Sequence, residues 1–151
     1  MIEKIGLIIL ALELAVLAVQ DIRYRKISIK LLVIMLAAGA ALQGISLLKG
    51  DRMGIGVTVF GVVLGLMLSV LGHFFGVIGT GDGIVVIIIT LMSGGAIAVV
   101  TFLLAITLAG IWAAFLLVFK KVKKKYEIPL IPFLLVSFIG TAFYVQIQAG
   151  L

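Results

Sequence analysis

The sequence has no cysteine, one histidine and two prolines in 151 residues. The absence of cysteine excludes disulfides, a thiolate nucleophile and a cysteine-bound metal. A single histidine also argues against a histidine-based metal site, so we expect no metal. Charged residues make up only 12% of the chain. Few chemical groups therefore remain from which a functional site could be built.

Apolar residues are abundant instead. They make up 64% of the chain, and the mean hydropathy is +1.44, which is too apolar for an ordinary soluble domain. A hydrocarbon core about 30 Å thick takes roughly 20 apolar residues per helical crossing, which leaves no room for a separate soluble domain. The sequence therefore predicts an all-α polytopic membrane protein in a lipid bilayer. The net charge of +6 indicates which way loops face and does not imply a nucleic-acid partner.

Six apolar segments are predicted to cross the bilayer as a six-transmembrane-helix bundle. The fourth and fifth come from one apolar run of 36 residues, 84–119, which is too long for one crossing and is broken at Ser93-Gly94-Gly95. We therefore expect a helical hairpin there. In the third segment, glycines offer faces for close helix packing: Gly54, Gly56, Gly61 and Gly65, with Ser69 at the end. The predicted spans are residues 2–20, 31–48, 53–71, 84–92, 96–119 and 128–147.

The basic residues predict the orientation. Nine Lys and Arg lie on one side of the predicted spans: Arg23, Arg25, Lys26, Lys30 and the five lysines of residues 120–125. Three lie on the other side: Lys4, Lys49 and Arg52. By the positive-inside rule the side with nine is cytoplasmic, and both termini face outward. The basic run at 120–125 is also suited to binding anionic lipid at that same face.

Two aspartates are predicted to share the cytoplasmic face. Asp21 ends the first span and Asp82 follows the third, so the two crossings between them return the chain to its starting leaflet. Residues 81–92 would reach only about 18 Å as a helix, so Asp82 is expected below the headgroups in a thinned or water-filled site. Because an even number of crossings separates them, two residues 61 positions apart in the sequence are possible neighbours in space.

The second aspartate lies in a glycine-rich segment, Gly79-Thr80-Gly81-Asp82-Gly83. Glycines let a backbone approach a bound peptide closely. The alternative is a loop that starts a helix with Asp82 as its N-cap. A phosphate cradle is not indicated, because the following lysine and a soluble βαβ context are missing.

Together these residues resemble the type IV prepilin peptidases, which are GxGD-type membrane aspartic proteases and include the archaeal preflagellin peptidases. The resemblance rests on Asp21 with its basic neighbours, on Gly79-Thr80-Gly81-Asp82, and on the proline-marked stretch 128–133. It implies one six-span peptidase domain over residues 1–151 in the plasma membrane. It also implies cleavage of the basic leader from prepilin, pseudopilin or preflagellin precursors at the cytoplasmic face, just before their apolar helix.

The same resemblance assigns roles to residues. Asp21 and Asp82 are implied as the catalytic pair, and Gly79, Thr80 and Gly81 as substrate-binding residues. Ser28-Ile29 stands where the family often has Pro-Asn, and Ile84 where it often has Lys, which bears on substrate preference. The chain lacks the Cys-rich cytoplasmic insertion of many bacterial members, which implies no N-methyltransferase activity.

Two carboxylates can hydrolyse a peptide without a cofactor if they share one proton. Asp82 would lie near the positive N-terminal end of a helix, which favours its ionised form, and Asp21 near a negative C-terminal end, which favours its protonated form. The positive charges of Arg23 and Arg25 favour the ionised form of Asp21 and so oppose the effect of the helix end on it.

Two other functions remain open. A small proton-coupled transporter or channel would use Asp21, Asp82 and the mid-span Glu13 as proton or ion sites, and Gln20 shares a helix face with Glu13. Two acids on one leaflet fit a local pair better than a relay across the membrane. A purely structural membrane subunit is the other alternative, and it would not need an acid flanked by glycines.

Overall fold

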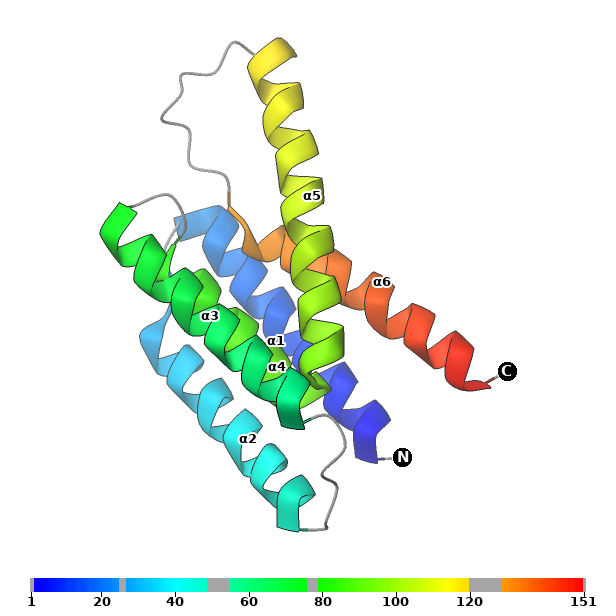
Figure 1. The fold of residues 1–151 in the computed structure, drawn as a ribbon. Helices are drawn as coiled ribbons and strands as arrows, with labels where there is room; N and C mark the ends of the chain where they lie inside the picture. Colours follow the sequence, from blue (N-terminus) through cyan, green and yellow to red (C-terminus); the bar gives the residue numbers. More distant parts are fainter. Residues whose placement is uncertain (1, 25–26, 49–54, 76–78, 120–128, 151) are drawn as a thin grey trace.

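The computed structural model describes residues 2–24, 27–48, 55–75, 79–119 and 129–150. All of the regular structure in these ranges is helical, which confirms the all-α fold class (Figure 1). The six helices are α1 (Ile2–Tyr24), α2 (Ile29–Leu48), α3 (Ile55–Phe75), α4 (Thr80–Ser93), α5 (Gly95–Phe119) and α6 (Ile131–Gly150).

Four of these helices, α2, α3, α5 and α6, are long and apolar enough to cross a membrane. Helix α4 has 14 residues and is shorter than a crossing needs. Helix α1 has 23 residues but carries five charged residues, Glu3, Lys4, Glu13, Asp21 and Arg23. The six predicted segments are thus six helices, while six full crossings remain a prediction. The start of α1 and the end of α6 lie toward the same end of the bundle (Figure 1).

The predicted hairpin between the fourth and fifth segments is present. Gly94 separates α4 from α5 with a φ of 91°, a left-handed conformation that favours glycine. Gly95 then begins α5 against the backbone of Val57 in α3, so closely that a Cβ at this position would overlap it. The break at Ser93-Gly94-Gly95 therefore makes a tight turn rather than a kink in one long helix.

Helix α4 is the core of the bundle. It packs against α3, α2, α5 and α1, and Val85, Val86, Ile88 and Ile89 are each no more than 1% exposed. A helix that is apolar on all sides is stable only when it is surrounded. The neighbouring helices provide that cover, and α4 brings its first residue Thr80 to one end of the bundle.

Glycines in α3 allow α4 to approach closely. A Cβ on Gly61 would lie 2.7 Å from the Thr90 hydroxyl oxygen, and one on Gly65 would lie 2.7 Å from the Gly83 carbonyl oxygen. The predicted packing role is therefore confirmed for Gly61 and Gly65. It is wrong for Gly56, which faces open space, and Gly54 lies outside the described residues.

Helix α1 buries one stripe of side chains at helical spacing: Leu10, Leu14, Leu17, Ala18 and Asp21. This helix packs mainly against α6 and α4. The stripe carries a carboxylate into the interior one turn before the helix ends, at the end of the bundle where α4 and α6 begin (Figure 1).

Candidate active site

Asp21 and Asp82 lie together at one end of the bundle. Asp21 is in the last turn of α1 and Asp82 in the first turn of α4, and each residue is 9% exposed. Asp21 is near enough for its charge to raise the pKa of Asp82. Both residues lie beyond the predicted spans 2–20 and 84–92, so the structure brings together the two acids that parity placed on one face.

The start of α4 fixes the Asp82 side chain. Asp82 Oδ2 accepts a hydrogen bond from Gly79 N–H at 3.1 Å, and Asp82 N–H donates to the Gly79 carbonyl at 3.0 Å. Gly79 is therefore the N-cap and Asp82 occupies the third helical position. The alternative that Asp82 itself is the N-cap is wrong.

Helix α3 holds this turn from behind. The Ser69 hydroxyl donates to the Thr80 carbonyl at 3.0 Å. A Cβ on Gly83 would overlap the Ser69 hydroxyl and the Gly65 carbonyl, and it would lie 2.6 Å from Ser69 N. The turn that carries Asp82 is thus held by the Gly79 hydrogen bond on one side and by close contact of Gly83 with Ser69 and the α3 backbone on the other.

The three predicted substrate-binding residues differ in their surroundings. Gly79 and Thr80 are exposed beside Asp82, whereas Gly81 is half-buried. A Cβ on Gly81 would lie 2.6 Å from Ile27 Cδ1, the flexible end of a side chain from the segment before α2. Sequence reasoning missed Ile27, because nothing in its local pattern indicates contact with a turn 54 residues later.

Asp21 has a partner from the far end of the chain. Asp21 Oδ2 accepts a hydrogen bond from Ile131 N–H at 3.3 Å, across a sequence separation of 110 residues. Ile131 is the first residue of α6, and the N-terminal end of a helix carries a partial positive charge. Pro129 and Pro132 marked this helix start in the sequence, but no sequence signal placed it beside Asp21.

The electrostatics of the pair reverse the roles expected from helix ends. Burial raises the pKa of Asp82, the charge of Asp21 raises it further, and the Gly79 hydrogen bond lowers it; the resulting pKa is about 7. Burial therefore outweighs the favourable end of α4, so at neutral pH Asp82 holds a proton far more often than an ordinary aspartate does. Asp21 accepts an N–H at a positive helix end, which favours its ionised form.

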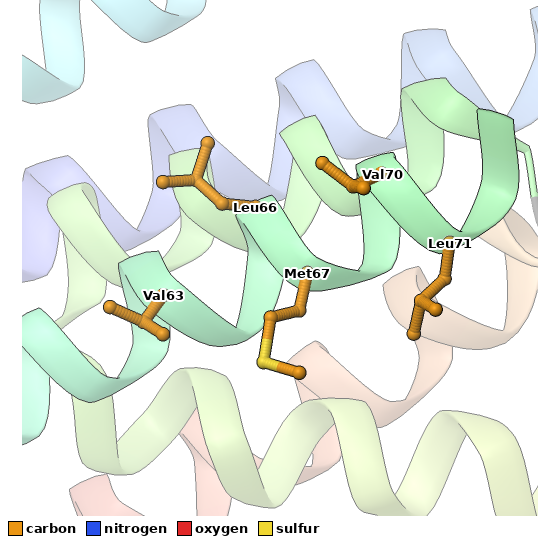
Figure 2. Close-up of a pocket in the computed structure, with 5 residues that line it drawn as sticks. All are labelled: Val63, Leu66, Met67, Val70 and Leu71. Atoms are coloured by element: carbon orange, nitrogen blue, oxygen red, sulfur yellow. The ribbon is translucent and has the colours of Figure 1, made fainter. Parts of the chain in front are cut away.

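An apolar groove on the outer face of α3 is separate from this pair. Figure 2 shows its lining residues, which all belong to α3: Val63, Leu66, Met67, Val70 and Leu71. These side chains are all between 43% and 57% exposed, as expected for a surface that faces lipid. The groove contains no polar side chain and is not a candidate for the chemistry.

The sequence profile of the type IV leader peptidase family matches residues 8–114, which is more than half of the chain. The chain belongs to the type IV leader peptidase family. No curated protein and no solved structure matches it. The matched range contains Asp21, Asp82 and the glycine-rich turn but ends before α6 begins. Family membership makes this chain a protease, in agreement with the resemblance found in its sequence.

Glu13 of the peptidase lies about two turns of α1 away from Asp21. It lies eight residues before Asp21, about 12 Å along α1. Its Oε2 atom is buried without a hydrogen-bond partner in the described part of the chain. Gln20, which shares its helix face, instead accepts a hydrogen bond from Ser28 N–H at 3.2 Å. A relay from Glu13 to the aspartates therefore has no visible intermediate.

The described ranges contain no group of three or more His, Cys, Asp and Glu side chains that could hold a metal ion. His73 is exposed and contacts the ring of Phe74 edge-on at 5.7 Å between centroids.

Asp82→Asn is expected to stabilise the peptidase in a pH-dependent way. Folding raises the pKa of Asp82 from 3.8 to about 7, so between these values the folded state binds a proton that the unfolded state releases. The contribution of Asp82 to stability is therefore fully present below about pH 4 and is lost as the pH rises to about 7. We expect Asp82→Asn to melt close to wild type at pH 4 and several degrees higher at pH 8. Thermal unfolding in detergent at pH 4, 6 and 8 measures this, and a Tm difference that does not grow with pH would contradict it.

Proposed function

We propose that this peptidase is a membrane aspartic endopeptidase that removes the basic leader from prepilin-like precursors with Asp21 and Asp82 as its catalytic pair. The observation that supports it best is the meeting of two buried carboxylates from α1 and α4 at one end of the bundle. Two acids this close resist simultaneous ionisation, so they hold one proton between them near neutral pH.

The two acids lie in different environments and therefore have different roles in the reaction. The ionised Asp21 takes a proton from water as the water oxygen attacks the peptide carbonyl carbon, and the protonated Asp82 donates its proton to the carbonyl oxygen. A tetrahedral diol forms. When it collapses, a diol hydroxyl returns a proton to Asp82, Asp21 gives its proton to the leaving nitrogen, and the C–N bond breaks. The starting charges are thereby restored without a metal or other cofactor.

The exposed backbone at Gly79 and Thr80 lies next to Asp82 and is suited to receive the substrate backbone. Gly81 contributes by leaving room for Ile27, which covers it. The substrate is a precursor whose basic leader stays in the cytoplasm while its apolar helix lies in the bilayer, so the scissile bond reaches the depth of the pair. The same proposal includes the preference of this chain for prepilin-like substrates and the absence of methyl transfer to the new N-terminus.

The proposal places the peptidase in the plasma membrane with the pair at the cytoplasmic face and both termini outside. Arg23 and Lys30 support this orientation, because both are exposed at the same end of the bundle as Asp21 and Asp82. The lysines of residues 120–125 lie outside the described residues. Their contribution to the orientation rests on the sequence alone.

Mapping the cut site tests the proposed function. The purified chain in proteoliposomes is incubated with one prepilin, and both products are identified by mass spectrometry. We expect a single cut between the basic leader and the apolar helix. The double variant Asp21→Asn/Asp82→Asn is the matched control for contaminating proteases. No cut by the wild type, together with proton flux in the same proteoliposomes, would favour the transporter alternative instead.

A further inference from the structure

The start of α6 meets the end of α1 at the catalytic pair. Ile131 N–H donates to Asp21 Oδ2 in a buried hydrogen bond, and the Ile131 residue is completely buried. This helix begins beyond residue 114, where the match to the family ends. The contact is therefore a property of this structure and does not follow from the matched segment.

The other first-turn donors of α6 are directed elsewhere. Pro132 has no N–H, and the N–H groups of Phe133 and Leu134 both donate to the Leu130 carbonyl at 3.0 Å. Ile131 therefore supplies the N–H through which the positive end of α6 acts on Asp21. A carboxylate that accepts such a bond is favoured in its ionised form.

Helices α4 and α6, which pack against α1, carry no basic residue in their described ranges. Helix α6 has no charged residue, and the only one in α4 is Asp82 itself. On α1, Arg23 follows two residues after Asp21 with an exposed side chain. The favourable contribution from α4 and α6 is thus the Ile131 N–H, and the unfavourable one is Asp82.

We propose that the start of α6 is a working part of the active site, in which Ile131 is a positioning residue whose backbone N–H holds the Asp21 carboxylate ionised and fixed beside Asp82. This inference rests on the proposed function, because it assigns Asp21 as the base of the pair. Without the N–H, the two acids would share their proton more evenly, and Asp21 would less often be the group that accepts the proton of water.

Ile131→Pro removes this N–H and suits the helix start, because proline is common at the first helical position. Ile131→Ala is the matched control, since it truncates the buried side chain but keeps the N–H. We expect kcat for prepilin cleavage by folded Ile131→Pro to fall about 10- to 100-fold with KM unchanged, as for loss of a hydrogen bond to a charged group. Ile131→Ala should stay within about threefold of wild type. An equal loss of kcat in both variants would assign the effect to side-chain packing and overturn the inference.

A titration separates this inference from the proposed function. The chain has three aspartates, Asp21, Asp51 and Asp82, so a ¹³C label on aspartate carboxyls gives three NMR signals that Asp→Asn variants assign. We expect the Asp21 transition to move up by about one pH unit in Ile131→Pro relative to Ile131→Ala. An unmoved transition overturns the inference. A wild type that cleaves no leader overturns the proposed function, while the titration still decides the role of Ile131.

A third variant covers the case in which Ile131→Pro does not fold. An α-hydroxy acid with the isoleucine side chain, incorporated at position 131, turns the amide between Leu130 and Ile131 into an ester. It removes the N–H and keeps the buried side chain. The same fall in kcat and the same shift of the Asp21 transition are expected, and wild-type values for both would overturn the inference.

Discussion

Asp21→Asn and Asp82→Asn are each expected to lower the rate of leader cleavage by about 10³-fold or more. The amide at position 21 cannot accept a proton from water, and the amide at position 82 cannot donate one in the same way. Each substitution preserves side-chain volume, and both variants should insert into membranes and fold normally. Initial rates of cleavage of one prepilin in proteoliposomes measure the effect, with circular dichroism as the check on folding.

The double variant makes this prediction sharper. Because the two acids act as a unit, Asp21→Asn/Asp82→Asn should be no slower than about tenfold below either single variant. Asp51→Asn, the third aspartate of the chain, is the matched control and should retain wild-type turnover. Near-wild-type cleavage by either single variant would show that the pair is not catalytic.

That the two acids lie at the same end of the bundle could be predicted because it depends on counting. Two apolar helices, α2 and α3, lie between Asp21 and Asp82, and together they take the chain across the bundle and back. The number of crossings depends neither on accurate helix ends nor on side-chain packing. The hairpin at Gly94 was predictable for a similar reason, since the length of the apolar run exceeds one crossing.

The protonation of the pair could not be predicted in the same way. Helix ends are visible in a sequence, whereas the burial of a particular side chain depends on which helices surround it. For Asp82 the cover from neighbouring helices outweighs the helix end. The Ile131 bond to Asp21 was equally hidden, because a contact across 110 residues between a side chain and a backbone N–H has no periodic signal.

The sequence pattern indicated only some of the glycines that lie at helix contacts. The glycine spacing in α3 correctly indicated a packing face at Gly61 and Gly65, but the same spacing included Gly56, which faces open space. The partner of this face on α4 was not identified. In the sequence Gly83 is marked only by its place beside Asp82, whereas in the structure α4 contacts the backbone of α3 at this residue.

Gly83→Ala is therefore expected to cost the peptidase both stability and activity. The new methyl group would overlap the Ser69 hydroxyl and the Gly65 carbonyl, and it would lie 2.6 Å from Ser69 N. Because two of these three atoms belong to the backbone, rotation of one side chain cannot relieve the overlap. Helix α4 must move away from α3, which costs about 1–3 kcal/mol of stability or more and carries Asp82 out of line with Asp21. We expect a Tm lowered by several degrees and leader cleavage reduced by at least about 10²-fold, since small misplacements of reacting groups have effects of this size.

Two further variants show whether the backbone contact is the cause. Gly110→Ala places the same methyl group in α5, where nothing lies within 4 Å, and it should leave cleavage unchanged while stability stays level or rises by up to about 1 kcal/mol. Adding Ser69→Ala to Gly83→Ala removes the hydroxyl but leaves the two backbone atoms, so neither Tm nor turnover should recover. Thermal unfolding and cleavage rates of the four proteins, wild type included, decide the matter. Recovery in the double variant would mean that only the Ser69 side chain stands in the way, and that α3 does not hold the Asp82 turn through its backbone.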